Sequence, residues 1–300
     1  MNYFLNHFIG DRLFLLLLNN ASRIKNDKFY LHLFYRFGMK RKLDLNNPTT
    51  YTEKIQALKL LNTNPLYSIL VDKYRVRDHV REKIGDEHLI PLIGVFDKFE
   101  DICFETLPNS FVLKTTHDSG TVIICKEKAG LDLEWARKKL VSSLSTNYFY
   151  RTREYPYKFA IPKIIAEKLI EQPNSESLID YKFFCFRGKA EFLQITSQLN
   201  GKKYVGFYTL DFQLHEFQTH ESYFDPTLIK PQNFENMIQI AEKLSAGIPH
   251  VRIDLYNVDG KIYFGEFTFH HNGGIIHFNP PIWDVKLGDK IIIPNISNSK

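Results

Sequence analysis

Two short segments near the C-terminus constrain the fold of this chain most. Residues 251–257 and 261–266 are rich in β-branched and aromatic side chains, and Asp259 and Gly260 lie between them. Segments of this composition on either side of an Asp-Gly pair predict two antiparallel strands joined by a tight turn. We therefore expect a β-hairpin here, with its charged residues held on a rigid sheet.

The length of the connecting loop decides which side chains share a face of this hairpin. A two-residue turn at the Asp-Gly pair sets Asp254 opposite Gly265, so Asp254 and Glu266 point in opposite directions. A three-residue loop that includes the preceding valine sets Asp254 opposite Phe264 and brings Arg252, Asp254 and Glu266 onto one face. Such a face can hold a divalent cation and a phosphate group, although charges on a strand also simply mark a solvated face.

Composition indicates an ordinary globular protein. The 300 residues can bury a sizeable core in two or three lobes, with 44% hydrophobic and 24% charged residues. The net charge of +5 suits an anionic ligand or surface without identifying one. Cys103, Cys125 and Cys185 are too few and too scattered for a disulfide framework or a zinc site, which predicts a cytoplasmic location.

An apolar run at residues 13–18 raises the question of membrane association. A membrane-spanning helix needs about 20 apolar residues, so we expect no transmembrane segment, and no signal-peptide cleavage site follows the run. We expect a buried helix. The alternative is peripheral association, in which the helix lies on a membrane surface or a partner with Arg23, Lys25 and Lys28 nearby.

The remaining chain mixes helical patterns with hairpins. Residues 1–90 have a mainly helical pattern, in which Thr50 and Glu53 form a capping box and Gly85 ends a helix that begins near residue 66. Hairpins mixed with helices favour an α+β architecture over a doubly wound parallel sheet. The further elements expected are strands at 111–114, 122–125 and from 164, a hairpin of 181–186 with 190–196, and helices at 133–144 and 234–244.

Two segments have the composition of nucleotide-binding loops. Lys114 ends a strand, and the small polar residues after it include Ser119 and Gly120, whose backbone N–H groups can meet a triphosphate. The spacing differs from a Walker loop, and any β-hairpin can have this pattern. The strand from residue 164 turns polar at Glu167, so it can link two lobes and pair with an adenine edge while Leu169 packs on the ring. A surface strand with mixed charges has the same pattern.

Three more groups are candidate site residues, each with a simpler explanation. Asp180 and Lys182 share a strand face by alternation, where they can bind ribose and phosphate or form a solvated ion pair. Residues 72–77 give their helix a basic side that can reach a nucleotide or be solvated. His270 and His271 are adjacent on a predicted strand, so they point apart and do not predict a zinc site.

The order of these segments resembles the ATP-grasp superfamily. More narrowly, the chain resembles the TupA-like ATP-grasp family found with surface-polysaccharide genes, over roughly residues 35–290. The segments that carry the resemblance are Asp72-Lys73, the Lys114 strand with its glycine loop, Glu167-Lys168-Leu169-Ile170, Asp180, Arg252-x-Asp254, and Glu266-x-Thr268 with glycines after it.

The resemblance implies a role for each of these residues. Thr268 stands where many ATP-grasp enzymes have Asn, two residues after the metal-binding Glu. The implied catalytic residues are Arg252, which steadies the transferred phosphoryl group, and Lys114. The implied ATP-binding residues are Lys73, Lys114, Ser119, Gly120, Glu167, Lys168, Leu169, Asp180 and Lys182, and the implied metal-binding residues are Asp254, Glu266 and Thr268.

The resemblance also implies a fold, two cofactors and a reaction. The expected fold is an α+β ATP-grasp fold, with a helical region at 1–95, a small lobe with the phosphate loop at 96–170, and a large lobe with the metal-binding hairpin at 171–300. The implied cofactors are ATP and Mg²⁺. The implied enzyme is an ADP-forming ligase that joins a carboxylate to an amine through an acyl phosphate, in surface or capsular polysaccharide biosynthesis.

The expected partners are a small-molecule or nucleotide-sugar carboxylate and an amine donor, and no nucleic acid. Two alternatives stay open at this point. One keeps the ATP site but transfers phosphate to a hydroxyl or carboxylate without an amine step. The other is a non-catalytic basic module that binds an anionic polymer, which predicts no magnesium-dependent ATP binding.

Overall fold

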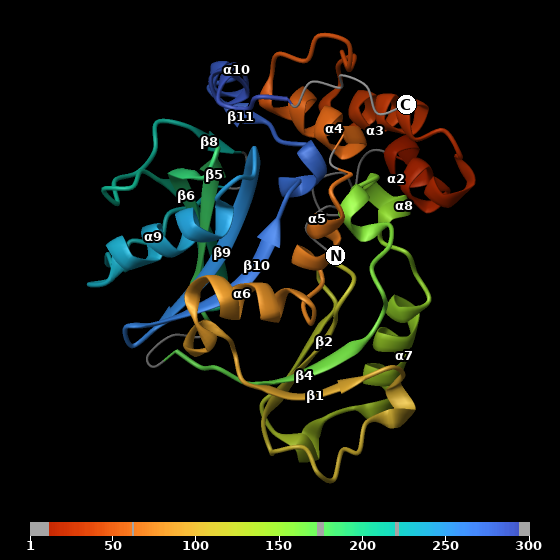
Figure 1. Ribbon diagram of the computed structural model, residues 1–300, viewed down its shortest axis with the longest axis vertical. Helices are drawn as coiled ribbons and strands as arrows, with labels where there is room; N and C mark the ends of the chain where they lie inside the picture. The colour runs from red at the N-terminus through yellow and green to blue at the C-terminus, as the bar shows by residue number, and fades with distance from the viewer. Residues whose placement is uncertain (1–11, 62, 173–176, 220–221, 294–300) are drawn as a thin grey trace. The chain divides into compact units, whose positions relative to one another are not determined.

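The computed structural model describes residues 12–61, 63–172, 177–219 and 222–293. The chain divides into two compact units (Figure 1). Unit 1 comprises residues 63–170, and unit 2 comprises the described parts of 8–62 and 171–300. Residues 12–61 therefore belong to the same unit as the C-terminal hairpin, whereas the sequence predicted three consecutive segments.

Unit 1 is built on a four-stranded antiparallel sheet with strand order β1-β4-β2-β3. The helix α7 packs against β2 and covers one face. The buried side chains of that face include Phe111, Leu113 and Ala136. The strands are β1 (Leu92–Phe96), β2 (Phe111–Thr115), β3 (Val122–Cys125) and β4 (Ile164–Lys168), and the helices are α5 (Pro65–Leu70), α6 (Val76–Ile84), α7 (Leu133–Leu144) and α8 (Phe149–Thr152).

Unit 2 is built on a five-stranded antiparallel sheet with strand order β10-β9-β5-β6-β7. Figure 1 shows α9 lying along one face of this sheet, where it contacts three of the strands. The strands are β5 (Asp180–Phe186), β6 (Lys189–Leu199), β7 (Lys202–Tyr208), β9 (His250–Val258) and β10 (Lys261–Thr268), with a small second sheet of β8 (Gln218–Thr219) and β11 (Phe278–Asn279).

The helices of unit 2 come from both ends of the chain. α4 packs on α10, and both contribute to one buried cluster with phenylalanines of β5 and β6. Tyr51, Ile55 and Leu58 of α4 are fully buried in this cluster. The helices are α2 (Arg12–Asn19), α3 (Asp27–Met39), α4 (Tyr51–Leu61), α9 (Phe234–Ser245) and α10 (Ile282–Asp289).

Most of the expected elements are confirmed. At the start of α4, Glu53 accepts hydrogen bonds from the backbone of Thr49 and Thr50 (both 3.1 Å), as a capping box requires. The single helix expected from residue 66 to residue 84 is wrong, because the chain turns between α5 and α6. Asp72 stabilises that turn by accepting from the backbone N–H groups of Tyr74 and Arg75.

The apolar run at residues 13–18 forms α2. In the described part of the chain, no helix is both long enough and apolar enough to cross a membrane.

Candidate functional site

The connection between β9 and β10 corrects the loop on which the sequence interpretation relied. Asp259 and Gly260 form a two-residue turn, with positive φ angles of 49° and 81°, and Val258 pairs with Lys261. These angles match a type I′ turn, whose twist fits that of the flanking strands. The three-residue loop is therefore wrong.

A bulge in β10 then restores the shared face. One extra residue at Gly265 shifts the register, so that Asp254 lies opposite Glu266 and Arg252 opposite Thr268. A Cβ atom on Gly265 would lie 3.0 Å from the backbone oxygen of Asp254, closer than Cβ atoms are normally found. Arg252, Asp254 and Glu266 do share one face, but the bulge rather than the turn puts them there.

Arg252 is the centre of this face. Its Nε and Nη2 donate to the two carboxylate oxygens of Asp254, both at 2.6 Å. Nη2 also lies 3.3 Å from Glu266 Oε1 and 3.0 Å from Thr268 Oγ1. Burial lowers the pKa of Arg252, but the charges of Asp254, Glu266 and Asp180 outweigh burial and raise it above its usual value. The guanidinium therefore organises both implied metal-binding carboxylates.

Two residues of β5 complete the same face, as strand alternation predicts. Lys182 lies opposite Asp254, and its Nζ is 2.9 Å from Asp180 and 3.6 Å from Asp254. The face thus carries three carboxylates and two cations within unit 2. Asp254 is 3% exposed, whereas the Glu266 side chain is 37% exposed. Glu266 is consequently the more accessible of the two implied metal-binding carboxylates.

A buried histidine, His271, contacts the Arg252 guanidinium from the protein interior. His271 lies with Nδ1 2.5 Å from Arg252 Nη1. Burial, followed by the positive charge of Arg252, lowers the pKa of His271 well below its usual value, so its neutral ring accepts this hydrogen bond. The ring also packs edge-on against Phe184. His271 thus holds the side of the guanidinium that faces away from Asp254.

In unit 1, Lys73 holds the loop after β2 rather than standing free. Its backbone N–H donates to the Thr116 carbonyl (3.1 Å), and its Nζ donates to the carbonyls of Thr115 and Asp118. The Asp118 carboxylate accepts from Thr115 Oγ1 (2.7 Å) and Ser143 Oγ (2.8 Å). Burial raises the pKa of Asp118, but Lys73 and the hydroxyl donors outweigh it and lower the pKa. The base of the loop is therefore fixed by a charged network.

The tip of this loop has a different character from its base. Ser119 and Gly120 are exposed, and Gly120 has a φ of 99°, which favours glycine. The Ser119 side chain is hydrogen-bonded to the side chain of Tyr148. An exposed tip on a fixed base can present backbone N–H groups to an anion.

Lys114 and Glu167 meet on the face of the unit 1 sheet that is opposite α7. Lys114 Nζ lies 2.7 Å from Glu167 Oε2, and Arg77 Nη1 of α6 lies 3.1 Å from Glu167 Oε1. Arg77 also donates to the Ile90 carbonyl at 2.8 Å. Glu167 is 5% exposed and lies in a strand that is paired on both sides. Its backbone and carboxylate are therefore both engaged within unit 1.

The remaining implied adenine-binding residues lie where β4 ends. Lys168 is the last residue of the strand and is exposed, and its backbone N–H donates to the Pro91 carbonyl at 2.9 Å. Leu169 follows outside the strand and is partly exposed. Leu169 thus lies beyond the end of β4, whereas Glu167 lies within the paired part of the strand.

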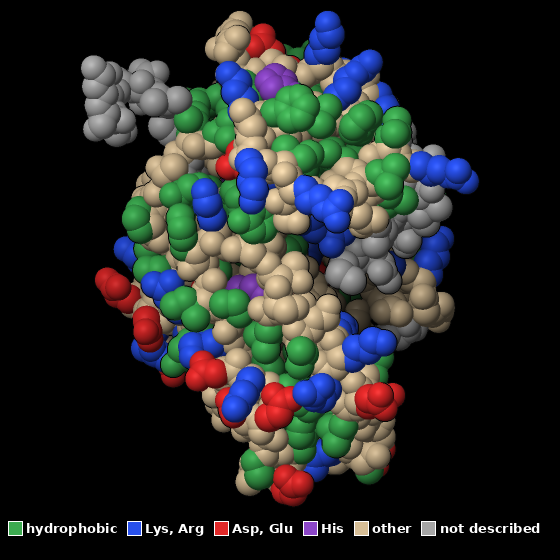
Figure 2. Space-filling view, turned by 90° about the vertical axis from the view of Figure 1, so that its right-hand side faces the viewer, with side chains coloured by type: hydrophobic (Ala, Val, Ile, Leu, Met, Phe, Trp, Pro, Cys, Tyr) green, Lys and Arg blue, Asp and Glu red, His purple; other side chains and the backbone are tan. Residues whose placement is uncertain are grey.

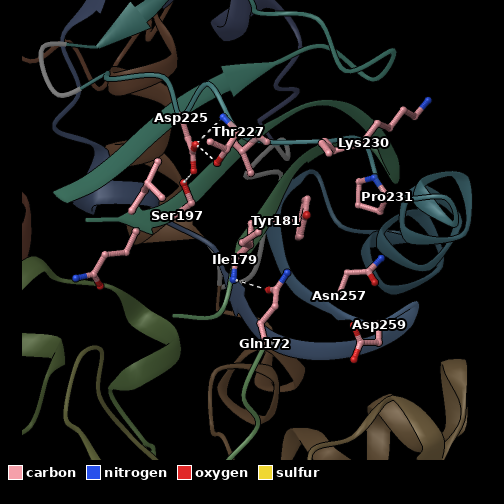
Figure 3. A pocket seen from close by; sticks show the side chains of 14 residues that line it. Gln172, Ile179, Tyr181, Ser197, Asp225, Thr227, Lys230, Pro231, Asn257 and Asp259 are labelled. Atoms are coloured by element: carbon pink, nitrogen blue, oxygen red, sulfur yellow. Dashed lines mark hydrogen bonds between the residues drawn. The ribbon is translucent and has the colours of Figure 1, made fainter. Parts of the chain in front are cut away.

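Unit 2 also contains a cavity of about 640 Å³ on the other face of its sheet. Tyr181 and Asn257 line it, and by alternation they point away from the side of Lys182 and Asp254. Figure 3 shows Asp225 turned toward Ser197 and Thr227, to which its oxygens are hydrogen-bonded at 2.6 Å each. This carboxylate is satisfied by its own neighbours and is therefore not free to hold a cation.

Sequence reasoning missed Arg77, Asp118 and His271 as parts of these networks. Arg77 was part of a basic run that looked solvated, but it is 8% exposed. Asp118 lies four residues after Lys114, within the segment already singled out, but its contact with Lys73 spans 45 residues and could not be predicted from the local sequence. His271 had no local signal, because its contact with Arg252 spans 19 residues.

Comparison with known proteins gives the assignment. The family model described as TupA-like ATP-grasp matches residues 53–292, well over half of the chain. The chain belongs to the TupA-like ATP-grasp family. The ATP-grasp fold expected from the sequence is thereby confirmed, and the superfamily is one of carboxylate–amine ligases. All the implied site residues of this ATP-grasp chain, from Lys73 to Thr268, lie inside the matched range.

Solved structures similar to this ATP-grasp chain include three enzymes. L-amino acid ligase from Bacillus licheniformis is 14% identical, with a TM-score of 0.45 and coverage of 75% of this chain and 50% of that chain. D-alanine–D-alanine ligase from Bacillus anthracis is 16% identical, with a TM-score of 0.43 and coverage of 78% and 72%.

N5-carboxyaminoimidazole synthetase from Staphylococcus aureus, complexed with ADP, is 15% identical, with a TM-score of 0.39 and coverage of 85% and 67%. The chain spans half the length of the L-amino acid ligase. No curated protein matches the sequence. The family assignment rests on the family match and not on these structural likenesses.

Proposed function

We propose that this ATP-grasp protein is an ADP-forming ligase that joins a carboxylate to an amine. The observation that carries the proposal is the group of Arg252, Asp254 and Glu266 on one face of the unit 2 sheet, in a chain that belongs to an ATP-grasp family. In the proposed reaction the substrate carboxylate attacks the γ-phosphorus of ATP, which releases ADP and leaves an acyl phosphate. The amine then attacks the acyl carbon, the C–O bond to phosphate breaks, and the amine loses a proton to give an amide and inorganic phosphate.

Unit 1 would bind the phosphates and the base of ATP. The loop tip at Ser119 and Gly120 presents backbone N–H groups, and Lys114 supplies a positive charge to phosphate oxygens. Lys73 would act by holding the loop, because its Nζ donates to two loop carbonyls. Glu167 and Arg77 would fix the position of Lys114. Leu169 would pack against the adenine ring.

Unit 2 would hold the metal and the transferred group. Asp254 and Glu266 face each other across the strand pair, and Mg²⁺ is usually held by one or two carboxylates together with substrate phosphates. When bound, Mg²⁺ would neutralise charge on the β- and γ-phosphate oxygens. Arg252 would orient both carboxylates, and Asp180 with Lys182 would contact the ribose and phosphate.

We further propose that the carboxylate belongs to a uronic acid or an amino acid and that the product is part of a surface glycan precursor. Support for the glycan comes from the family resemblance alone. The acceptor would be a small molecule or a nucleotide sugar.

The test is ADP release measured against a panel of nucleotide-activated uronic acids and small amines, with product analysis. The ligase predicts ADP and phosphate in equal amounts, together with a new amide. A stable phosphorylated acceptor without an amide would instead establish a phosphotransferase. If the protein did not bind ATP in a magnesium-dependent way, that result would contradict both enzyme functions and favour a non-catalytic binding module.

A further inference from the structure

The positive charge of this protein is concentrated in one short part of unit 2. Residues 12–42 contain eight Lys or Arg and one Asp, a net charge of +7. Because the whole chain has a net charge of +5, the rest of the chain has a net charge of −2. Apart from Arg41, which pairs with Asp284, all of these basic side chains are exposed. They are Arg12, Arg23, Lys25, Lys28, Arg36, Lys40 and Lys42.

The helix α2 in this region is apolar on two sides. Phe14 and Leu17 are buried, and the Phe14 ring packs on Phe34 of α3 with a centroid separation of 5.4 Å. Leu13 and Leu16, three residues apart and so on one side of the helix, are 59% and 57% exposed. The sequence expectation of a buried helix thus holds for one side of α2 only.

A third exposed apolar side chain lies close in sequence. Phe29, in the first turn of α3, is 55% exposed and follows Lys28 directly. Figure 2 shows hydrophobic and basic side chains intermingled over the upper part of the drawn face. We call Leu13, Leu16 and Phe29, with the exposed basic residues of 12–42, the α2–α3 surface.

We propose that the α2–α3 surface binds an anionic lipid bilayer. Basic side chains next to a negatively charged leaflet each contribute attraction, and exposed leucine and phenylalanine side chains can enter the boundary between headgroups and acyl chains. A soluble polyanion would use the charges but would leave the two leucines and Phe29 in water. The exposed apolar side chains therefore favour a bilayer over a polyanion such as a nucleic acid or an acidic glycan.

The first test measures co-sedimentation of the full chain with vesicles of phosphatidylcholine, with and without phosphatidylglycerol. We expect binding to the anionic vesicles, weakened by ~0.5 M salt, and little binding to pure phosphatidylcholine. The double variant Leu13→Gln/Leu16→Gln should bind the anionic vesicles at least ~10-fold more weakly, because two apolar side chains no longer leave water. The matched control is Leu133→Gln in α7, which is 47% exposed and should bind as the unmodified chain does.

The second test reverses charge on the same surface. Arg23→Glu/Lys25→Glu/Lys28→Glu should weaken binding to anionic vesicles by ~100-fold or more. The matched control reverses three exposed lysines of unit 1, namely Lys83→Glu/Lys126→Glu/Lys138→Glu, and should retain most of the binding. Thermal unfolding of each variant checks that the fold survives, and neither readout depends on ATP.

Two results would overturn the proposal. One is that the unmodified chain stays in the supernatant with anionic vesicles. The other is that the double leucine variant binds as tightly as the unmodified chain while the charge-reversed variant does not, which would identify the surface as a site for a soluble polyanion.

Discussion

The Glu167 carboxylate lies between two cations inside unit 1, so we expect the stability of the protein to be sensitive to its replacement. Replacing it by glutamine leaves Lys114 and Arg77 near each other without a negative charge. Breaking a buried ion pair from one side costs about 3 kcal/mol or more. We expect Glu167→Gln to lower the free energy of unfolding by about that amount, measured by urea denaturation.

The matched control is Glu100→Gln, because Glu100 pairs with Arg137 on the surface. That change should leave the urea midpoint nearly unaltered. If the Glu167→Gln variant were as stable as the unmodified chain, the charges of Lys114 and Arg77 would not need the Glu167 carboxylate as the structure indicates.

Protonation of His250 gives a pH-dependent prediction. His250 Nε2 lies 2.9 Å from the Tyr51 hydroxyl and its Nδ1 lies 2.9 Å from the Cys185 carbonyl. Burial is the main cause that lowers the pKa of His250, to about 3. His250 therefore binds a proton more readily in the unfolded chain than in the folded one. Its contribution to the free energy of unfolding is fully present above about pH 6.5 and is lost as the pH drops toward 3.

His250→Gln should therefore flatten the loss of unfolding free energy between pH 6.5 and pH 4, by up to about 1.4 kcal/mol per pH unit. Urea unfolding at several pH values measures that slope. An unchanged slope in this variant would mean that His250 does not resist protonation in the folded state.

At the scale of elements, the bulge in β10 decides the geometry of the candidate site. Gly265→Ala places a Cβ atom 3.0 Å from a backbone oxygen of β9, and a backbone atom cannot move aside as a side-chain end can. We expect a loss of about 1–2 kcal/mol of stability and a larger loss of ADP release, because Glu266 is displaced. Thermal unfolding and ADP assays measure the two effects.

Gly130→Ala is the matched control, because a Cβ there meets nothing within 4 Å. It should behave as the unmodified chain does. If Gly265→Ala retained both stability and ADP release, the bulge would not be needed to position Glu266.

The sequence predicted elements well where the signal was local. Strand alternation and the Asp-Gly pair predicted the hairpin, and the capping box predicted the start of α4. The bulge was not predicted, although a glycine inside a strand is a known indication of one. The break between α5 and α6 was also missed, because the side chain of Asp72 competes with the helix for backbone N–H groups.

At the scale of the whole molecule, long-range contacts limited what the sequence could predict. Asp284 accepts hydrogen bonds from the backbone and hydroxyl of Thr52, 232 residues away, both at 2.9 Å. Lys59 donates to the Gly273 carbonyl, 214 residues away, at 2.8 Å. No local pattern predicts such partners, so the N-terminal helices could not be assigned to the unit of the C-terminal hairpin. The face-sharing of Asp180 and Lys182 needed only strand alternation, and it was predicted.

These contacts predict that unit 2 depends on its N-terminal helices. Deletion of residues 1–61 removes Tyr51, Ile55 and Leu58 from the buried cluster. Losing three buried side chains costs roughly 5–9 kcal/mol, as much as the whole stability of many domains. The truncated chain should aggregate or lose its near-ultraviolet circular dichroism, whereas a folded truncated chain with native spectra would contradict the packing described here.

The most direct test of the central claim is magnesium-dependent ADP release by Glu266→Gln. Because the Glu266 side chain is 37% exposed, its replacement should leave the fold intact while removing a metal ligand. The matched control is Glu191→Gln, whose side chain is 33% exposed and pairs with Lys290. We predict that Glu266→Gln loses ADP release by ~10²-fold or more with an unchanged unfolding midpoint, and that Glu191→Gln keeps its activity. Near-normal ADP release by Glu266→Gln at every magnesium concentration would contradict the assignment of this face as the metal and phosphoryl site.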